Sequence, residues 1–206
     1  MTIPTEDTAE RAEDSEAYLV NRSKQGDLAA FNQLVEAHQR SVFNICLRMV
    51  GNPAAAEDST QDAFISAYRS IVTFRGASFR AWLMRIAANC CTDQLRRRAR
   101  RPAVSLDAPQ AGDEPALDVA DTAPGPEESA LRADEAARVQ AALQRLPEDQ
   151  RLAVVMCDMQ GFSYEEIAEA MRCSLGTVKS RIARGREKLR PLLVESEGTN
   201  AAPGAS

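Results

Sequence analysis

The chain of 206 residues has little histidine and few aromatic side chains, with one His, one Trp, three Tyr and six Phe. Its five cysteines form no CxxC pair, and with His38 as the only histidine the ligand set of a zinc site is missing. No apolar run approaches the roughly 20 residues of a membrane helix, and the N-terminus is acidic, unlike a secretory signal. We expect a cytoplasmic protein with reduced, buried thiols, no metal, no cofactor and no membrane insertion.

The same scarcity argues against catalysis. A single histidine offers little acid–base chemistry, the serines fall at predicted helix caps and turns, and there is no glycine-rich phosphate loop. We therefore predict a protein that is not an enzyme and has no small-molecule substrate. The enzymatic alternative, a small DNA recombinase ending in a helix-turn-helix, would need a nucleophile and a cluster of arginines or carboxylates.

The charge of the chain is segregated along its length. The net charge is −5 and the isoelectric point about 5.1. Residues 27–101 nevertheless carry eleven basic and six acidic groups, whereas residues 102–130 carry seven acidic and no basic groups. Such asymmetry suggests nucleic-acid contact by parts of the chain rather than by its average. Residues 102–130 also hold five of the ten prolines, which is typical of a flexible linker.

Residues 163–190 have the pattern of two short helices joined by a tight turn. Ser163 followed by Glu166 is typical of a capping box, and Ser174 with Thr177 indicates a second N-cap. The second helix should bury an apolar stripe and leave a polar, basic face pointing away from the core. That face consists of Thr177, Lys179, Ser180, Arg181 and Arg184.

The charge of this second helix favours DNA binding over simple solvation. Between residues 176 and 190 there are six Lys or Arg and one Glu, a sum of +5. Thr, Lys, Ser and Arg are the side chains that contact base edges and phosphates. Gly185 lies on the apolar stripe, where close helix packing suits a residue without a side chain. The pattern predicts a helix-turn-helix, spanning Tyr164 to Ala183, whose second helix enters the major groove.

Residues 27–101 show the apolar spacing of three helices. Asp27 is a plausible N-cap and Gly51 a plausible stop for the first. The second, residues 54–71, should pack inward through a face that includes Phe64 and Tyr68. Its other face alternates carboxylates with an isolated isoleucine, which is suited to anchoring a partner helix, although charged faces are usually only solvated. That face consists of Asp58, Gln61, Asp62, Ile65 and Arg69.

The third predicted helix, residues 79–101, follows a turn at residues 74–78 that Ser78 can cap. Trp82 should be a core residue rather than a base-stacking platform, and the expected buried set is Phe79, Trp82, Leu83, Ile86 and Cys90. Five arginines follow this apolar stripe between residues 96 and 101. A run this dense suits phosphate contact, because arginine binds phosphate in a bidentate manner and like charges repel along a helix.

These motifs resemble bacterial RNA polymerase sigma factors, most closely the extracytoplasmic-function, sigma-E-like group. The fourth, promoter-reading region of that family is similar to SYEEIAEAM and GTVKSRIARGREKLR. Its second region, which binds polymerase, is similar to EDSTQDAFISAYRSI, and its minus-ten section to GASFRAWLMRIAANCCTDQLRR. This chain has Asp62 where the family usually has glutamate, and Ser59 where it has an apolar residue.

The resemblance implies partners and roles. It implies binding to core polymerase, at the β′ clamp helices and the β subunit, through Asp58, Gln61, Asp62, Ile65 and Arg69. It implies minus-ten DNA contact through Phe74, Arg75, Ser78, Arg80, Asn89, Arg96 and Arg97. It implies minus-thirty-five contact through Thr177, Lys179, Ser180, Arg181 and Arg184. It also implies promoter-specific initiation in a stress or envelope-signal response, and an anti-sigma inhibitor.

The predicted fold is therefore all-α, with two small helical domains and an acidic, proline-rich linker. An ordinary helix-turn-helix regulator is the alternative within the same binding class. It would leave the arginine run and the acidic face of residues 54–71 without roles. The expected layout begins with a polar arm (1–26) that is disordered or loosely docked, with at most a short helix near residues 17–22. A sigma region 2 domain (27–101), the linker (102–130), a sigma region 4 domain (131–195) and a disordered tail (196–206) follow.

Overall fold

The computed structural model describes the backbone of residues 6–76, 78–100 and 126–194, and every regular element within these ranges is helical. The predicted all-α class is confirmed. The N-terminal half holds α1 (Glu6–Lys24), α2 (Leu28–Val50), α3 (Pro53–Ser70), the 3-10 turn η1 (Ile71–Thr73) and α4 (Phe79–Arg100). The C-terminal half holds α5 (Pro126–Gln144), α6 (Glu148–Val154), the π-helical turn η2 (Val155–Met159), α7 (Tyr164–Met171) and α8 (Leu175–Val194). No described helix is long and apolar enough to cross a membrane.

Helix ends in the N-terminal half follow the capping residues. The Asp27 carboxylate accepts from the Ala30 amide at 3.1 Å, and Gly51 ends α2 in the left-handed region with φ of 77°. Asn52 caps α3 by accepting from the Ala55 amide at 2.9 Å. Ser78 Oγ accepts from the Ala81 amide at 3.1 Å at the start of α4. The predicted caps at Asp27 and Ser78 and the stop at Gly51 are confirmed.

The core of the N-terminal half lies between α2, α3 and α4. Large side chains of α2 and α4, among them Leu34 and Leu83, are fully buried there. At the start of α4 an aromatic cluster closes the core, with the Phe74 ring centroid 5.3 Å from Trp82 and 5.8 Å from Phe79. Trp82 is buried, so its prediction as a core residue is confirmed.

Helix α4 is buried on more sides than its apolar stripe predicted. Cys91 and Met84 are fully buried, whereas Cys90, expected inside, is only half-buried. The reason is that α4 contacts α2 and α3 along one side and α7 of the C-terminal half along another. Small alanines on α4 therefore face a neighbouring helix instead of solvent. All five cysteines are free thiols, but only Cys46 and Cys91 are buried.

The N-terminal segment is more ordered than the loosely docked arm expected for residues 1–26. Helix α1 runs well beyond the short helix predicted near residues 17–22, and Val20 enters the core. The only histidine, His38 of α2, pairs with Glu16 of α1 at 2.6 Å and is buried. The expectation of a loose arm is therefore wrong for the second half of α1.

The linker and tail predictions fall mostly outside the described residues. Helix α5 begins at Pro126, inside the segment 102–130 that was assigned to the linker, so that boundary is wrong by several residues. Residues 101–125 and 195–206 are outside the part of the chain that the structure describes.

The C-terminal half packs α6, α7 and α8 around Val155, Met156, Ile167 and Ile182. The Ser163–Glu166 capping box is present in both directions at the start of α7. Arg172 ends α7 in the left-handed region with φ of 49°, and Ser174 Oγ accepts from the Thr177 amide at 3.2 Å to start α8. The predicted helix-turn-helix and both of its caps are confirmed as local structure.

Gly185 lies at the closest approach of α8 to α6. A Cβ at this position would lie 2.6 Å from Val154 Cγ2 and 3.4 Å from the Gln150 carbonyl oxygen. Val154 is buried and has no flexible chain to move aside. The sequence-based expectation of close packing at Gly185 is thus confirmed.

Gly185→Ala is expected to lower the free energy of unfolding by about 1–2 kcal/mol, because overpacking a core costs about 1–3 kcal/mol and outweighs the helix propensity gained. Gly176→Ala is the matched control on the same helix, since its Cβ would meet only Ser174 Oγ at 3.8 Å. That control should be stabilising by about 0.5–1 kcal/mol. Urea unfolding measures both; a stabilising Gly185→Ala would contradict the close packing.

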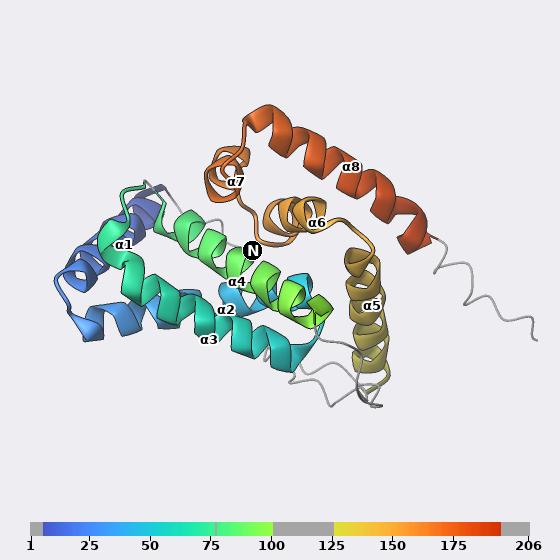
Figure 1. Cartoon of the computed structure of the whole chain (residues 1–206), viewed down its shortest axis with the longest axis horizontal. Helices are drawn as coiled ribbons and strands as arrows, with labels where there is room; N and C mark the ends of the chain where they lie inside the picture. Colours follow the sequence, from blue (N-terminus) through green and yellow to red (C-terminus); the bar gives the residue numbers. More distant parts are fainter. Residues whose placement is uncertain (1–5, 77, 101–125, 195–206) are drawn as a thin grey trace, which may run out of the picture.

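The two halves pack against each other (Figure 1). Helix α7 lies against α4, while α5 and α6 lie at the C-terminal end of α2. The first helix of the helix-turn-helix therefore faces the helix predicted to hold minus-ten DNA. The helix-turn-helix thus lies beside α4, while Lys179, Ser180 and Arg184 of its second helix stay exposed.

Candidate polymerase and nucleic-acid interfaces

The predicted polymerase-binding residues form one exposed face of α3. Asp58, Gln61, Asp62, Ile65 and Arg69 are all exposed. Ile65 is 48% exposed although it is apolar. Among the described residues none of the five makes a hydrogen bond or ion pair with another side chain. Two carboxylates, an amide, an isoleucine and an arginine are thus presented together to solvent.

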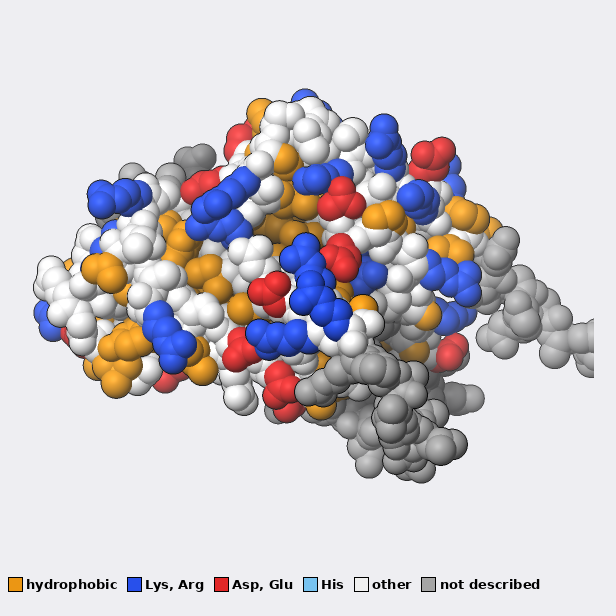
Figure 2. All heavy atoms as spheres, in the orientation of Figure 1, with side chains coloured by type: hydrophobic (Ala, Val, Ile, Leu, Met, Phe, Trp, Pro, Cys, Tyr) orange, Lys and Arg blue, Asp and Glu red, His pale blue; other side chains and the backbone are white. Residues whose placement is uncertain are grey.

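This face continues into an apolar area that sequence reasoning missed. Tyr68, expected to point inward, is 39% exposed, and Val72 one turn later is 63% exposed. The Tyr68 ring packs edge-on against Phe31 of α2 at 5.0 Å, next to Leu28, which is 55% exposed. Figure 2 shows hydrophobic side chains gathered at this end of the molecule, where α2 begins and α3 ends. This apolar area is identified by the exposure of large apolar side chains, which helical periodicity in the sequence does not show.

Ser59, at the position where the family usually has an apolar residue, is nearly fully buried. Its Oγ donates to the Ala55 carbonyl oxygen at 2.8 Å. A buried hydroxyl is tolerated when it is hydrogen-bonded. The departure from the family pattern at this position is accommodated within α3 and leaves the exposed face unchanged.

Three predicted minus-ten residues lie at the start of α4. Phe74 is buried in the aromatic cluster, and Lys24 lies over its ring at 5.1 Å. Ser78 Oγ donates to Glu166 Oε1 of α7 at 3.3 Å. The Arg80 guanidinium donates to the Gln160 carbonyl oxygen at 2.6 Å and stacks 3.8 Å from the Phe162 ring centroid. Ser78 and Arg80 are thus bound to the C-terminal half.

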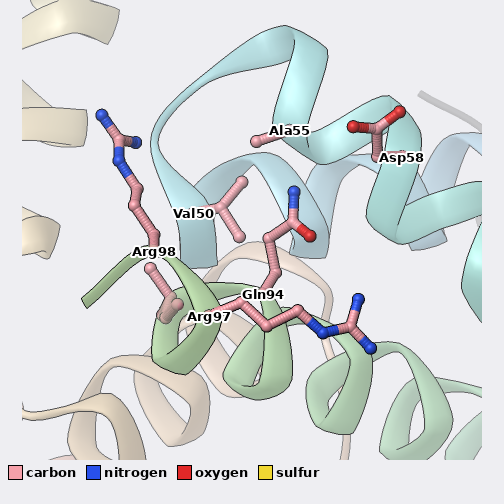
Figure 3. A pocket seen from close by; sticks show the side chains of 7 residues that line it. Val50, Ala55, Asp58, Gln94, Arg97 and Arg98 are labelled. Carbon is pink, nitrogen blue, oxygen red and sulfur yellow. The ribbon is translucent and has the colours of Figure 1, made fainter. Parts of the chain in front are cut away.

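The other predicted minus-ten residues, Arg75, Asn89, Arg96 and Arg97, are exposed. Arg96 has only a loose ion pair with Asp93 at 3.8 Å. Arg97 and Arg98 border an open hollow of about 440 Å³ between the ends of α2, α3 and α4, with Asp58 on another wall. Figure 3 shows the two arginines extending in different directions from α4. The residues predicted to bind polymerase and those predicted to bind DNA meet at this hollow.

A second hollow, of about 470 Å³, lies between the two halves. Asn89 and Arg85 of α4 line one side, and Arg172 and Arg181 of the helix-turn-helix line the other. Burial lowers the pKa of Arg85, and the nearby Arg172 lowers it further. Sequence reasoning missed Arg85, although it lies one turn before Asn89 on the same face of α4.

The recognition helix α8 leaves most of its predicted DNA face open. Lys179, Ser180 and Arg184 are exposed, and Ser180 Oγ donates to the Thr177 carbonyl oxygen at 2.9 Å. Thr177 is half-buried, and its hydroxyl shares a hydrogen bond of 2.9 Å with the capping residue Ser174. These side chains occupy the first turns of the helix.

Arg181 does not point away as the spacing predicted. Its Nε donates to Asp149 Oδ2 of α6 at 2.9 Å, and its Nη1 donates to Cys173 Sγ at 3.4 Å. Arg186, further along α8, is ion-paired with Asp158, and this pairing lowers the pKa of the Asp158 carboxyl. The acidic side chains of α6 and η2 thus hold two arginines of α8 on the inner side. Within the described residues, no three His, Cys, Asp or Glu side chains gather as metal ligands.

Two family models match this chain, one in its N-terminal half and one in its C-terminal half. The model of sigma-70 region 2 matches residues 34–101, and the model of sigma-70 region 4 matches residues 136–189. The RNA polymerase sigma-H factor of Pseudomonas aeruginosa is 40% identical over 194 residues, covering 89% of this chain and 98% of that protein. The chain belongs to the extracytoplasmic-function sigma factors. As a sigma factor it is a transcription initiation factor and not an enzyme, which confirms both sequence-based predictions.

Other sigma factors are similarly close. The extracytoplasmic-function sigma-E factor of Escherichia coli K12 is 40% identical over 181 residues, covering 85% of this chain and 94% of that protein. Among solved structures, CnrH in complex with the cytosolic domain of CnrY superposes with a TM-score of 0.66 at 27% identity. It matches 88% of this chain and 99% of CnrH. RpoE of Bartonella quintana, in complex with the anti-sigma factor NepR, gives 0.58 at 28% identity, covering 79% and 96%.

Proposed function

We propose that this sigma factor binds core RNA polymerase through α3 and grips promoter DNA at two points, through residues 74–101 and through α8. The observation that carries the proposal is the separation of three surfaces within one family-defined chain. An exposed acidic and apolar face lies on α3, an arginine-rich end on α4 and a basic recognition helix at α8. The proposed domains are residues 27–101 and 131–195, and the proposed compartment is the cytoplasm, where polymerase and chromosomal DNA are found.

The α3 face suits the β′ clamp helices. Asp58 and Asp62 offer charge for complementary pairing, and Ile65 offers an apolar anchor of the kind that dominates interface energies. We include Tyr68 and Val72 in this surface, because they extend the same helix face with exposed apolar area. Asp62 keeps the charge of the usual family glutamate with a shorter side chain.

The α4 surface suits minus-ten DNA. Arg96 and Arg97 are exposed and free to meet phosphate, and Asn89 can reach a base edge. Flipping a base out of the stack costs a few kcal/mol, which a pocket and a basic flank must offset. Phe74, buried in the aromatic cluster, serves in this proposal as a wall of that site rather than as an exposed stacking platform.

The α8 surface suits the minus-thirty-five element. Lys179, Ser180 and Arg184 lie exposed in the first turns of the second helix, where a helix-turn-helix contacts bases and phosphates. We further propose an anti-sigma inhibitor as a partner, because CnrH is solved with CnrY and RpoE of Bartonella quintana with the anti-sigma factor NepR.

Arg181→Ala is expected to reduce transcription from the cognate promoter several-fold while core binding is retained. Its ion pair with Asp149 is partly exposed, with 26% and 47% of the two side chains accessible, so the stability cost should be only about 0.5 kcal/mol. Asp149→Ala is the matched control, because it breaks the same pair without removing the arginine. Equal loss of transcription and core binding in Arg181→Ala would make the residue structural.

A pull-down with core RNA polymerase in the absence of DNA tests the proposed function. The sigma factor should be retained stoichiometrically by core enzyme. An ordinary helix-turn-helix regulator would bind DNA alone and leave core enzyme unbound, and this result would sink the proposal.

A further inference from the structure

The hollow between α4 and the helix-turn-helix has the size of a small-molecule site. Its volume is about 470 Å³, and ligand pockets in proteins measure about 300–1,000 Å³. The apolar side chains of Trp82, Ile86 and Leu152 line it next to charged ones, which is the mixture that organic ligands require. None of the five α3 residues proposed to bind polymerase lines this hollow.

Two arginines of the hollow have no counter-ion. Arg181 pairs with Asp149 at 2.9 Å. Arg85 and Arg172 make no side-chain hydrogen bond or ion pair within the part of the chain that the structure describes. Burial lowers the pKa of the half-buried Arg85, the nearby Arg172 lowers it further, and Glu169 offsets only part of this effect. Two like charges that face each other across a concave surface attract an anion.

Arg172 is held beside Arg85 at a cost to the backbone. Its φ of 49° lies in the left-handed region, and among the described residues it is the only non-glycine with a positive φ. The residue that follows a helix in this conformation is usually glycine or asparagine, because a Cβ atom disfavours it. Strained residues of this kind concentrate at functional sites. The backbone of the turn favours glycine, so a role of the guanidinium accounts for the arginine.

We propose that Arg85 and Arg172 form a binding site for a small phosphate monoester, of the size of a nucleoside monophosphate, between α4 and the turn of the helix-turn-helix. Guanidinium groups bind phosphate oxygens through paired, charge-assisted hydrogen bonds. One arginine from each wall can thus hold the same phosphate. The ligand neutralises the repulsion between the two side chains and contacts both halves of the chain.

The α6 wall of the hollow limits the charge of this ligand. Glu148 and Asp149 lie there, and Asp149 is neutralised by Arg181. The remaining carboxylate of Glu148 repels a second phosphate, whereas the hydroxyl and amino groups of a nucleoside can donate hydrogen bonds to it. The site therefore favours a monophosphate with a polar organic part over a triphosphate.

Calorimetric titration of the full chain with AMP, GMP, ATP and inorganic phosphate is the direct test. AMP or GMP should bind with one molecule per chain and more tightly than ATP or inorganic phosphate. Adenosine, which lacks the phosphate, should bind at least about tenfold more weakly than AMP. Trp82 is the only tryptophan of the chain and lines the hollow, so a change in its fluorescence places the ligand there.

Two variants remove the guanidinium groups separately. Arg172→Gly should stay folded, because glycine adopts the left-handed conformation without strain. Arg172→Gly and Arg85→Gln should each weaken AMP binding by about 10- to 100-fold, the effect of losing hydrogen bonds to a charged group. Arg145→Gln is the matched control, since Arg145 is exposed and does not line the hollow. The control should bind AMP like the wild type, and thermal unfolding shows that each protein is folded.

The probes need neither polymerase nor promoter, so their failure to bind leaves the proposed function untouched. Absence of saturable binding of every probe at millimolar concentration would overturn the site, as would AMP binding that both arginine variants retain. Equal weakening by Arg145→Gln would mean that general charge binds the nucleotide. If promoter DNA required both arginines while AMP and phosphate did not bind, the pair would contact the DNA backbone instead, and the proposal would be wrong.

Discussion

Asp58→Lys is expected to weaken binding of core RNA polymerase by roughly 10- to 100-fold, since close charge pairs across interfaces couple by about 1.5–7 kcal/mol. Asp58 is exposed on the proposed polymerase-binding face of α3 and has no hydrogen-bonding or ion-pairing partner among the described residues. Reversal of its charge therefore leaves the fold intact and replaces attraction with repulsion at the proposed contact. Titration of labelled protein with core enzyme, without DNA, measures the effect.

Glu57→Lys is the matched control for this experiment. It makes the same charge change one residue earlier, on an exposed side chain that is not among the five residues of the proposed face. The control should bind core enzyme within a few-fold of the wild type, and thermal unfolding should show both variants folded. Equal weakening by the two substitutions would mean that general charge, not the α3 face, governs polymerase binding.

Replacing Lys179 and Arg184 together with alanine is expected to reduce promoter-specific transcription by roughly 10- to 1,000-fold, since specific contacts are worth about 1–3 kcal/mol each. Both side chains are exposed and lie in the first half of α8. Core binding through α3 should remain unchanged. Single-round transcription at several salt concentrations measures the loss.

Lys188→Ala with Arg190→Ala removes the same charge from the later turns of α8 and is the matched control. Both of these residues are exposed as well, but they lie beyond the first turns that enter a groove. The control should lose much less activity at low salt. If both double variants lost activity equally, α8 would act through overall charge and not through recognition.

The local structure of this chain was largely predictable from its sequence. Capping by Asp27, Ser78 and Ser163 and the stop at Gly51 each depend on one residue and its near neighbours. Helix starts and stops of this kind can be predicted from sequence because tertiary contacts do not compete with them. The helix-turn-helix and the exposed face of α3 follow from them directly.

Contacts between distant segments were not predictable in the same way. The half-burial of Arg181 depends on its ion pair with Asp149, 32 residues earlier in the chain. The Arg80 guanidinium is likewise held by a hydrogen bond to the Gln160 carbonyl oxygen. Gln140 and Gln144 of α5 donate to backbone oxygens at the C-terminal end of α2. Every residue has a backbone oxygen, so the sequence of α2 does not indicate these contacts. Periodicity also misplaced Tyr68 and Cys90, because it identifies one apolar stripe and cannot show which helix will cover a second one.

Transcription in vitro tests the central claim most directly. Core RNA polymerase with this sigma factor on fragmented genomic DNA should initiate at discrete start sites that share two upstream sequence elements, while core enzyme alone should not. Asp58→Lys should reduce those starts by weakening assembly, and the Lys179 and Arg184 double variant should reduce them although assembly is retained. Random initiation by polymerase carrying the wild-type protein, or specific DNA binding with no effect on initiation, would contradict the account.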